Sequence, residues 1–216
     1  MIMSYLGSLR DNSPKVALYN LKPWLDSENK FMAFISSKCA STSILYHLDD
    51  RVIRPGRPFY KDMLEKISID KIFKFTVVRN PFDRIVSSFF FLQQRGYINK
   101  DFTFRYFVLN ELPKYDLTEN ILEENQIKRV IQTHCSFQYI RCGHEYIDFI
   151  AKFDNIKKDW KYIASKIDAK PILPHYMKTE HDEYKNCYDK ELINIVSEIY
   201  SKDIKTFKFN KLDYNK

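Results

Sequence analysis

IFKFTVVRNPFDRIVSSFFF, residues 72–91, contains the pattern that decides the fold. Its first part, residues 72–78, is short, apolar and rich in strand formers, as expected of a strand buried in a parallel sheet. Asn80 is a suitable N-cap, and Pro81 suits the first position of a helix. The apolar residues that follow recur at helical spacing: Phe82, Ile85, Val86, Phe89 and Phe90. The stretch therefore predicts a strand, a tight turn and an amphipathic helix.

The same alternation of strand and helix recurs along the chain. FMAFIS (31–36) and EYIDFIAKF (145–153) are further strand candidates. One helix is predicted from the face Ile156, Trp160, Ile163 and Ile167, and another from Leu192, Ile195, Val196 and Ile199, with Asp189 near its start. This order predicts an α/β fold, a single P-loop-like domain with a central, mainly parallel sheet flanked by helices. Ligands of such folds bind beyond the carboxyl ends of the strands.

Length and composition indicate one domain and an anionic partner. The 216 residues are 44% hydrophobic, enough for one sizeable core, and no linker or repeat divides residues 1–216. With 35 basic and 28 acidic side chains, the formal charge is +7. Such a chain attracts an anion, whether nucleic acid, an acidic glycan, a membrane surface or a phosphorylated cofactor, and charge alone does not choose among these.

The sequence also bears on the compartment. No stretch approaches the roughly 18 uninterrupted apolar residues of a membrane span, and the first residues lack the pattern of a signal peptide. The four cysteines form no C-x-x-C pair and are too sparse for a disulfide scaffold. We therefore expect a cytoplasmic protein with reduced thiols and no integral membrane segment.

A hydroxyl-rich loop with one lysine follows the first predicted strand. Such a loop, leading into a helix, would direct backbone N–H groups, hydroxyls and a helix N-terminus at one anion. It consists of Ser37, Lys38, Cys39, Ala40, Ser41, Thr42 and Ser43. The nucleotide triphosphatase motif G-x-x-x-x-G-K-[ST] is absent, and no apolar strand ends in an aspartate that could hold magnesium. The loop alone also fits an ordinary turn with a solvated lysine.

The second strand ends in a matching cation. Arg79 and Ser87 are spaced so that both can face one anion beside the sheet. The alternative is that Arg79 simply pairs with Asp83 and that Ser87 is a polar flank.

Together, the lysine loop and the later R-N-P-F-D-R-x-x-S segment resemble the two cofactor loops of the sulfotransferases, particularly the carbohydrate sulfotransferases of sulfotransferase family 2. Further segments resemble that family in the same order, so that the likeness covers about residues 31–209: HCSFQYI (134–140), residues 148–167, LPHYM (173–177) and residues 188–209. Ser37 and Phe137 stand where the family often has proline. The family's amino-terminal Golgi anchor is not recognisable, which suggests a cytoplasmic, bacterial relative.

The resemblance implies a donor and a reaction. The donor would be 3′-phosphoadenosine-5′-phosphosulfate (PAPS), with the first loop around its 5′-phosphosulfate and with Arg79 and Ser87 on its 3′-phosphate. The products would be 3′,5′-adenosine bisphosphate and a sulfated hydroxyl, most simply on a saccharide, with no metal and no nucleic acid involved. Lys38 would neutralise the leaving phosphate oxygen, while Thr42, Ser43 and backbone N–H groups would hold the 5′-phosphate.

An acceptor hydroxyl needs a general base. His134 is the first candidate, because the resemblance includes it and because nearby Gln138 could orient the acceptor. His47, on the helix after the phosphate loop, and Glu65 stay open as alternatives.

The sequence leaves three other interpretations. His134, Cys135, Cys142 and His144 match no usual zinc spacing, so buried thiols are the simpler explanation. A nucleotide or small-molecule kinase with a degenerate phosphate loop would respond to ATP and magnesium. A basic nucleic-acid-binding module would bind polynucleotides with a steep salt dependence.

Overall fold

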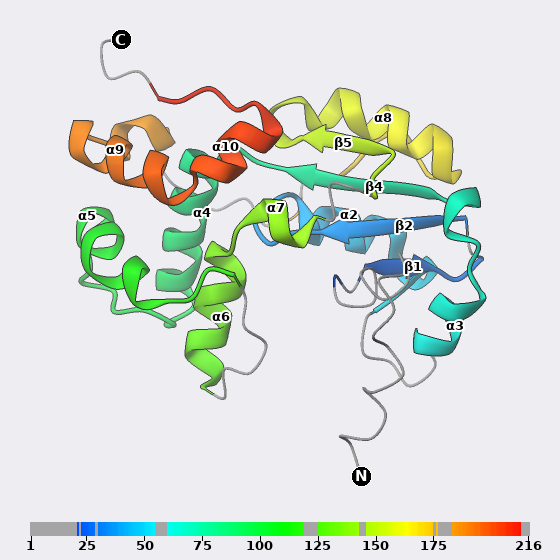
Figure 1. Cartoon of the computed structure of the whole chain (residues 1–216), viewed down its shortest axis with the longest axis horizontal. Coiled ribbons are helices and arrows are strands. Elements are labelled where there is room, and N and C mark those ends of the chain that lie inside the picture. The colour runs from blue at the N-terminus through cyan, green and yellow to red at the C-terminus, as the bar shows by residue number, and fades with distance from the viewer. Residues whose placement is uncertain are drawn as a thin grey trace.

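The computed structural model describes residues 21, 23–28, 30–54, 60–118, 125–142, 146–174, 176 and 183–212. In this part of the chain, five strands form one sheet in the order β3-β1-β2-β4-β5 (Figure 1). The strands are β1 (Trp24–Asp26), β2 (Phe31–Ile35), β3 (Val52–Ile53), β4 (Phe73–Val78) and β5 (Phe149–Lys152).

Strands β2, β4 and β5 are parallel and form the predicted centre of the sheet. Phe31 of β2 is in register with Phe73 of β4, and Phe75 of β4 with Phe149 of β5. The sequence did not predict β1 and β3, which are antiparallel to their neighbours. With three and two residues, they are too short to show a hydrophobic period. The fold is the predicted α/β class.

The helices follow the strands as predicted, with several additional ones. They are α2 (Ser41–Leu48), α3 (Tyr60–Lys66), α4 (Pro81–Gln94), α5 (Phe104–Tyr106), α6 (Gln126–Cys135), α7 (Gln138–Arg141), α8 (Ile156–Ile167), α9 (Lys190–Ile199) and α10 (Ser201–Phe207). A π-helical turn, Phe107–Glu111, continues α5. Short 3₁₀ turns span Asp49–Arg51, Ile69–Lys71, Leu112–Lys114, Phe153–Asn155 and Tyr184–Cys187. None of the described helices is both long enough and apolar enough to cross a lipid bilayer.

Both faces of the sheet are covered by helices. Along β2, alternate side chains point to opposite faces. Phe31 and Ala33 are buried in the core formed with α2 and α8, whereas Met32 and Phe34 are buried with residues of β1 and α3. This burial on both faces is the reason why β2 and β4 read as nearly continuous apolar runs.

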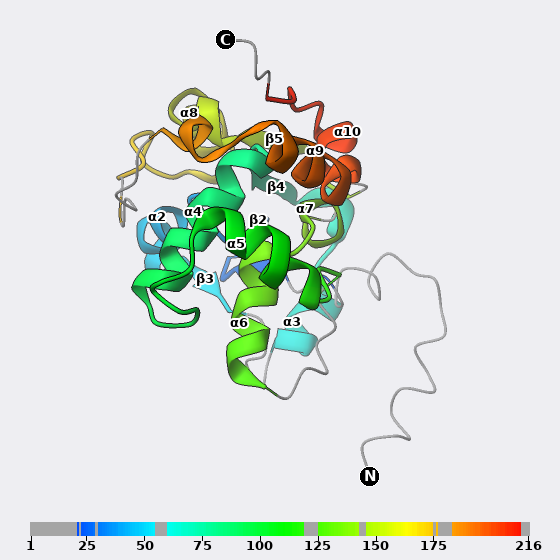
Figure 2. The same ribbon diagram turned by 90° about the vertical axis from the view of Figure 1, so that its left-hand side faces the viewer.

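A second, helical core lies beyond the carboxyl ends of the parallel strands. Figure 1 shows α4, α5, α6 and α9 gathered at the ends to which β2 and β4 point, and Figure 2 shows the same group from that side. The apolar face predicted for α4 is buried there, with Phe82, Ile85 and Val86 at 0% exposed. The Asn80 side chain accepts a hydrogen bond from the Phe82 N–H, so the predicted cap is confirmed.

Candidate active site

The loop between β2 and α2 has an unusual backbone. Lys38 (φ 65°) and Ala40 (φ 59°) are both in the left-handed region, although neither is glycine. That conformation costs roughly 1–2 kcal/mol for an ordinary residue. Such strain persists where the surrounding structure imposes it and is common at functional sites. α2 begins directly after Ala40, so its N-terminus opens at this loop.

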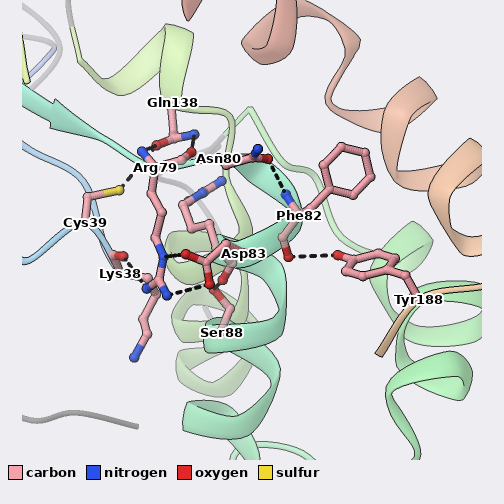
Figure 3. A network of polar contacts seen from close by, with 10 residues as sticks. Lys38, Cys39, Arg79, Asn80, Phe82, Asp83, Ser88, Gln138 and Tyr188 are labelled. Atoms are coloured by element: carbon pink, nitrogen blue, oxygen red, sulfur yellow. Dashed lines mark hydrogen bonds and ion pairs between the residues drawn. The ribbon is translucent and has the colours of Figure 1, made fainter. Parts of the chain in front are cut away.

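Arg79, immediately after β4, reaches across to the same loop. Its Nε and Nη2 atoms donate to the two carboxylate oxygens of Asp83 at 2.6 and 2.7 Å, and Nη1 donates to the Lys38 carbonyl at 3.0 Å (Figure 3). The pairing with Asp83 considered from the sequence is therefore present. The two bonds to Asp83 and the one to the Lys38 carbonyl use three of the five guanidinium N–H groups, so two remain for a ligand. The guanidinium also lies over the Phe153 ring, 4.2 Å from its centroid.

One cavity of about 1200 Å³ brings the two predicted loops together. Nine of the predicted site residues line it: Ser37, Lys38, Ala40, Ser41, Thr42, Ser43, Arg79, Ser87 and His134. The Ser43 Oγ accepts the Tyr176 N–H at 3.0 Å and can still donate its own hydrogen. The loop residues, the cation at the end of β4 and the candidate base thus share one space.

Two predicted site residues do not line the cavity. Cys39 is buried, and its thiol points to Gln138. Gln138 is itself 0% exposed, and its amide bonds the backbone of Arg79 rather than facing the cavity. This geometry does not support the acceptor contact predicted for Gln138. The reason is that Gln138, the first residue of α7, is packed beneath the two loops.

The two alternative bases also lie elsewhere. The Nε2 atom of His47 is 3.1 Å from the Lys170 carbonyl, and its ring packs edge-on against Trp160. It lines a neighbouring pocket instead. Glu65 is exposed on α3, which packs against residues of β1 and β2. It does not line the cavity. Among the three candidates, only His134 borders the cavity.

His134 and Lys38 meet at the ring of Phe91. The imidazole stacks on that ring with centroids 4.6 Å apart, and the Lys38 Nζ lies 4.3 Å from the ring centroid. The His134 Nδ1 is 2.8 Å from the Val130 carbonyl. Because a carbonyl can only accept, Nδ1 carries the hydrogen, which leaves Nε2 of the neutral ring as a proton acceptor.

Both groups have lowered pKa values. Burial, followed by the charge of Arg79, lowers the pKa of Lys38 to about 8. Burial lowers the pKa of His134 to about 4, and the Lys38 and Arg84 charges act in the same direction. At neutral pH the site therefore presents a charged lysine and a neutral histidine. A bound anion would raise both pKa values, because it favours the charged forms.

Helix α4 also positions His134. Ser88 Oγ donates to the His134 carbonyl at 2.8 Å, and the buried Arg84 donates to the carbonyls of His134, Cys135 and Ser136. A cation at the carbonyl end of a helix is favourable. The helix that carries Ser87 thus also holds the end of α6.

Sequence reasoning missed several residues of the cavity wall. Three further cations line it, Arg95, Lys157 and Lys161. Lys157 and Lys161 are four residues apart on α8 and therefore share a face, a signal present in the 148–167 block. Phe91 was not identified as a cavity residue because it lies in an apolar run. No carboxylate occurs among the described residues that line the cavity, so its charged groups are all basic.

The metal alternative finds no support in the described residues. Cys135 and Cys142 are buried in different clusters. In the ranges that the structure describes, no three His, Cys, Asp or Glu side chains gather closely enough to hold a metal ion. His144 lies outside the described residues, as does His175 of the 173–177 segment.

We predict that Lys38→Met makes the protein more stable at pH 7. The folded-state pKa of Lys38 is lowered to about 8, so folding at pH 7 must retain a charge that burial disfavours. Removing that charge should raise the free energy of unfolding by about 1 kcal/mol, or Tm by about 2–4 °C, measured by thermal denaturation. Because wild-type Lys38 loses its charge as pH rises above 8, the advantage should shrink at pH 10.

The matched control is Lys157→Met, which alters an exposed lysine of the same cavity. Its Tm should equal that of the wild type at both pH values. A Lys38→Met protein that melts below the wild type at pH 7 would contradict this interpretation of the buried charge.

The fold and the cavity define an α/β protein with a basic cavity, at which a lysine and a neutral histidine lie close together. The model of the sulfotransferase family matches residues 22–210, most of the chain, and the chain therefore belongs to the sulfotransferase family. No curated protein and no solved structure gave a significant match. The family supports sulfuryl transfer as the general reaction.

Proposed function

We propose that the protein transfers the sulfuryl group of PAPS to a hydroxyl group of a saccharide. The observation that supports this most directly is the shared cavity, in which the Lys38 loop and the Arg79/Ser87 pair face the same basic space. A donor with phosphate groups at both its 5′ and 3′ positions needs two such anion sites at a fixed separation. The saccharide acceptor and the cytoplasmic location stay predictions from the sequence resemblance.

In this proposal, each cavity residue has a distinct task. Thr42, Ser43 and the backbone N–H groups of the loop hold the 5′-phosphate, and Arg79 and Ser87 bind the 3′-phosphate. PAPS supplies the activated sulfuryl group. Lys38 neutralises the bridging phosphate oxygen that keeps the electron pair of the breaking S–O bond.

His134 acts at the other end of the transfer. Its Nε2 atom accepts the proton of the acceptor hydroxyl as the oxygen forms its bond to sulfur. The Val130 contact supports this role because it keeps the hydrogen on Nδ1. Among the described residues, the cavity lining is basic and holds no carboxylate, which suits an anionic donor, whereas a kinase would need groups that hold magnesium.

We predict that 3′,5′-adenosine bisphosphate stabilises the protein against heat and that ATP with magnesium does not. A ligand at 100 times its Kd stabilises the folded state by about 2.7 kcal/mol, which corresponds to a Tm rise of roughly 5–10 °C for a chain of this size. Thermal denaturation with each ligand measures the difference. Stabilisation by ATP and magnesium alone would instead favour the kinase alternative, and tight, salt-sensitive polynucleotide binding would favour the nucleic-acid module.

A variant of Arg79 tests whether this side chain binds the bisphosphate. Arg79→Ala is combined with Asp83→Asn, because Arg79→Ala alone would leave a buried carboxylate without its partner. The double variant should lose about 2–4 kcal/mol of affinity for the bisphosphate and bind 5′-AMP nearly as well as the wild type. Asp83→Asn alone retains the guanidinium and should keep most of the affinity.

A further inference from the structure

Gln138 joins the two loops through one side chain. Its Nε2 donates to the Arg79 carbonyl, and its Oε1 accepts the Arg79 N–H, both at 2.8 Å (Figure 3). The same Oε1 accepts the Cys39 thiol at 3.2 Å. Cys39 belongs to the first loop and Arg79 to the second, so the amide acts as a bridge between segments 40 residues apart in the sequence.

The start of α7, which carries Gln138, is fixed by hydrogen bonds to α10. The N–H groups of Gln138 and Tyr139 donate to the two carboxylate oxygens of Asp203 on α10, at 3.0 and 2.8 Å. Gln138 and Asp203 are both 0% exposed. Asp203 thus fixes the backbone that carries Gln138, and the hydrogen-bonded, buried amide has little freedom to move. Gln138 therefore keeps a fixed position relative to the end of β4.

A second contact ties the loops together on the cavity side. Arg79 Nη1 donates to the Lys38 carbonyl at 3.0 Å. The loops are thus connected twice, by the buried Gln138 amide and by the Arg79 guanidinium on the cavity side. Such double fixation matters for a ligand that must reach both loops at once, because groups held at the right spacing avoid the cost of ordering them on binding.

We propose that Gln138 is a positioning residue that sets the spacing between the two loops, so that one ligand can engage both with two phosphate groups. This inference rests on the proposed function, in which the loops bind the 5′- and 3′-phosphates. It replaces the acceptor contact expected for Gln138 from the sequence.

The test compares 3′,5′-adenosine bisphosphate with 5′-AMP, which needs only the first loop, by calorimetric titration. In Gln138→Met, the preference for the bisphosphate over 5′-AMP should fall by about 10- to 100-fold, while the affinity for 5′-AMP stays within about threefold of wild type. Gln132→Met, at another buried glutamine, is the matched control and should keep the wild-type preference.

A milder pair of variants covers the case in which Gln138→Met does not fold. Cys39→Ala removes only the link to the first loop and should reduce the same preference, whereas Cys39→Ser retains a donor to Oε1 and should restore it. An unchanged preference in Gln138→Met and Cys39→Ala, or a parallel loss of both ligands, would overturn the positioning role. A wild-type protein without any preference for the bisphosphate would overturn the proposed function instead.

Discussion

Lys38→Ala should lower kcat by about 10²–10³-fold, the usual effect of removing one group that stabilises transition-state charge. Affinity for 3′,5′-adenosine bisphosphate should change far less. The reason is that charge on the leaving phosphate oxygen grows during the reaction, and an interaction that is stronger in the transition state appears in turnover. Single-turnover rates with PAPS, together with calorimetric affinities for the product, measure the two effects separately.

The pH dependence gives an independent check on Lys38. Burial lowers its pKa to about 8 in the free protein, so the charged form is lost as pH rises through that value. kcat/KM of the wild type should therefore fall above pH 8, and this alkaline limb should be absent in Lys38→Ala. A variant that loses affinity but keeps kcat would show that Lys38 only binds the donor, and one that keeps the alkaline limb would show that another group causes this limb.

His134→Ala should lower the rate by about 10²–10⁴-fold, the range for loss of a general base, with the affinity for the bisphosphate close to wild type. His134 must be neutral to accept a proton, and its pKa in the free protein is lowered to about 4. The acidic limb of kcat/KM should therefore lie near pH 4 and disappear in His134→Ala. The limb of kcat should lie at a higher pH, because the bound anion favours the charged imidazole.

His47→Gln is the matched control for this variant. His47 bonds the Lys170 carbonyl and lines a different pocket, so the change should leave kcat near the wild-type value. If His134→Ala keeps both its rate and the acidic limb while His47→Gln loses them, the assignment of the base is wrong. That outcome would leave the predictions for Lys38 unaffected.

The elements that carry the site were predictable because their signals are local. The strand, turn and helix of residues 72–91 can be recognised from short stretches of sequence, since hydrophobic periodicity and helix capping depend on near neighbours. Asn80 bonds the N–H of Phe82, two residues on, and Asp189 bonds that of Leu192, three residues on. Arg79 precedes α4 and Ser87 lies within it, and their position beside the same cavity follows from the same helical geometry.

Contacts between distant segments were not predictable in this way. The sequence placed Gln138 near the site but could not show which way its amide faces, because this depends on Arg79 and Cys39, 59 and 99 residues earlier in the chain. The choice among His134, His47 and Glu65 stayed open for the same reason. Local hydrogen bonds and hydrophobic periods are properties of a short segment, whereas a cavity wall exists only after the packing of many segments has set the direction of each side chain.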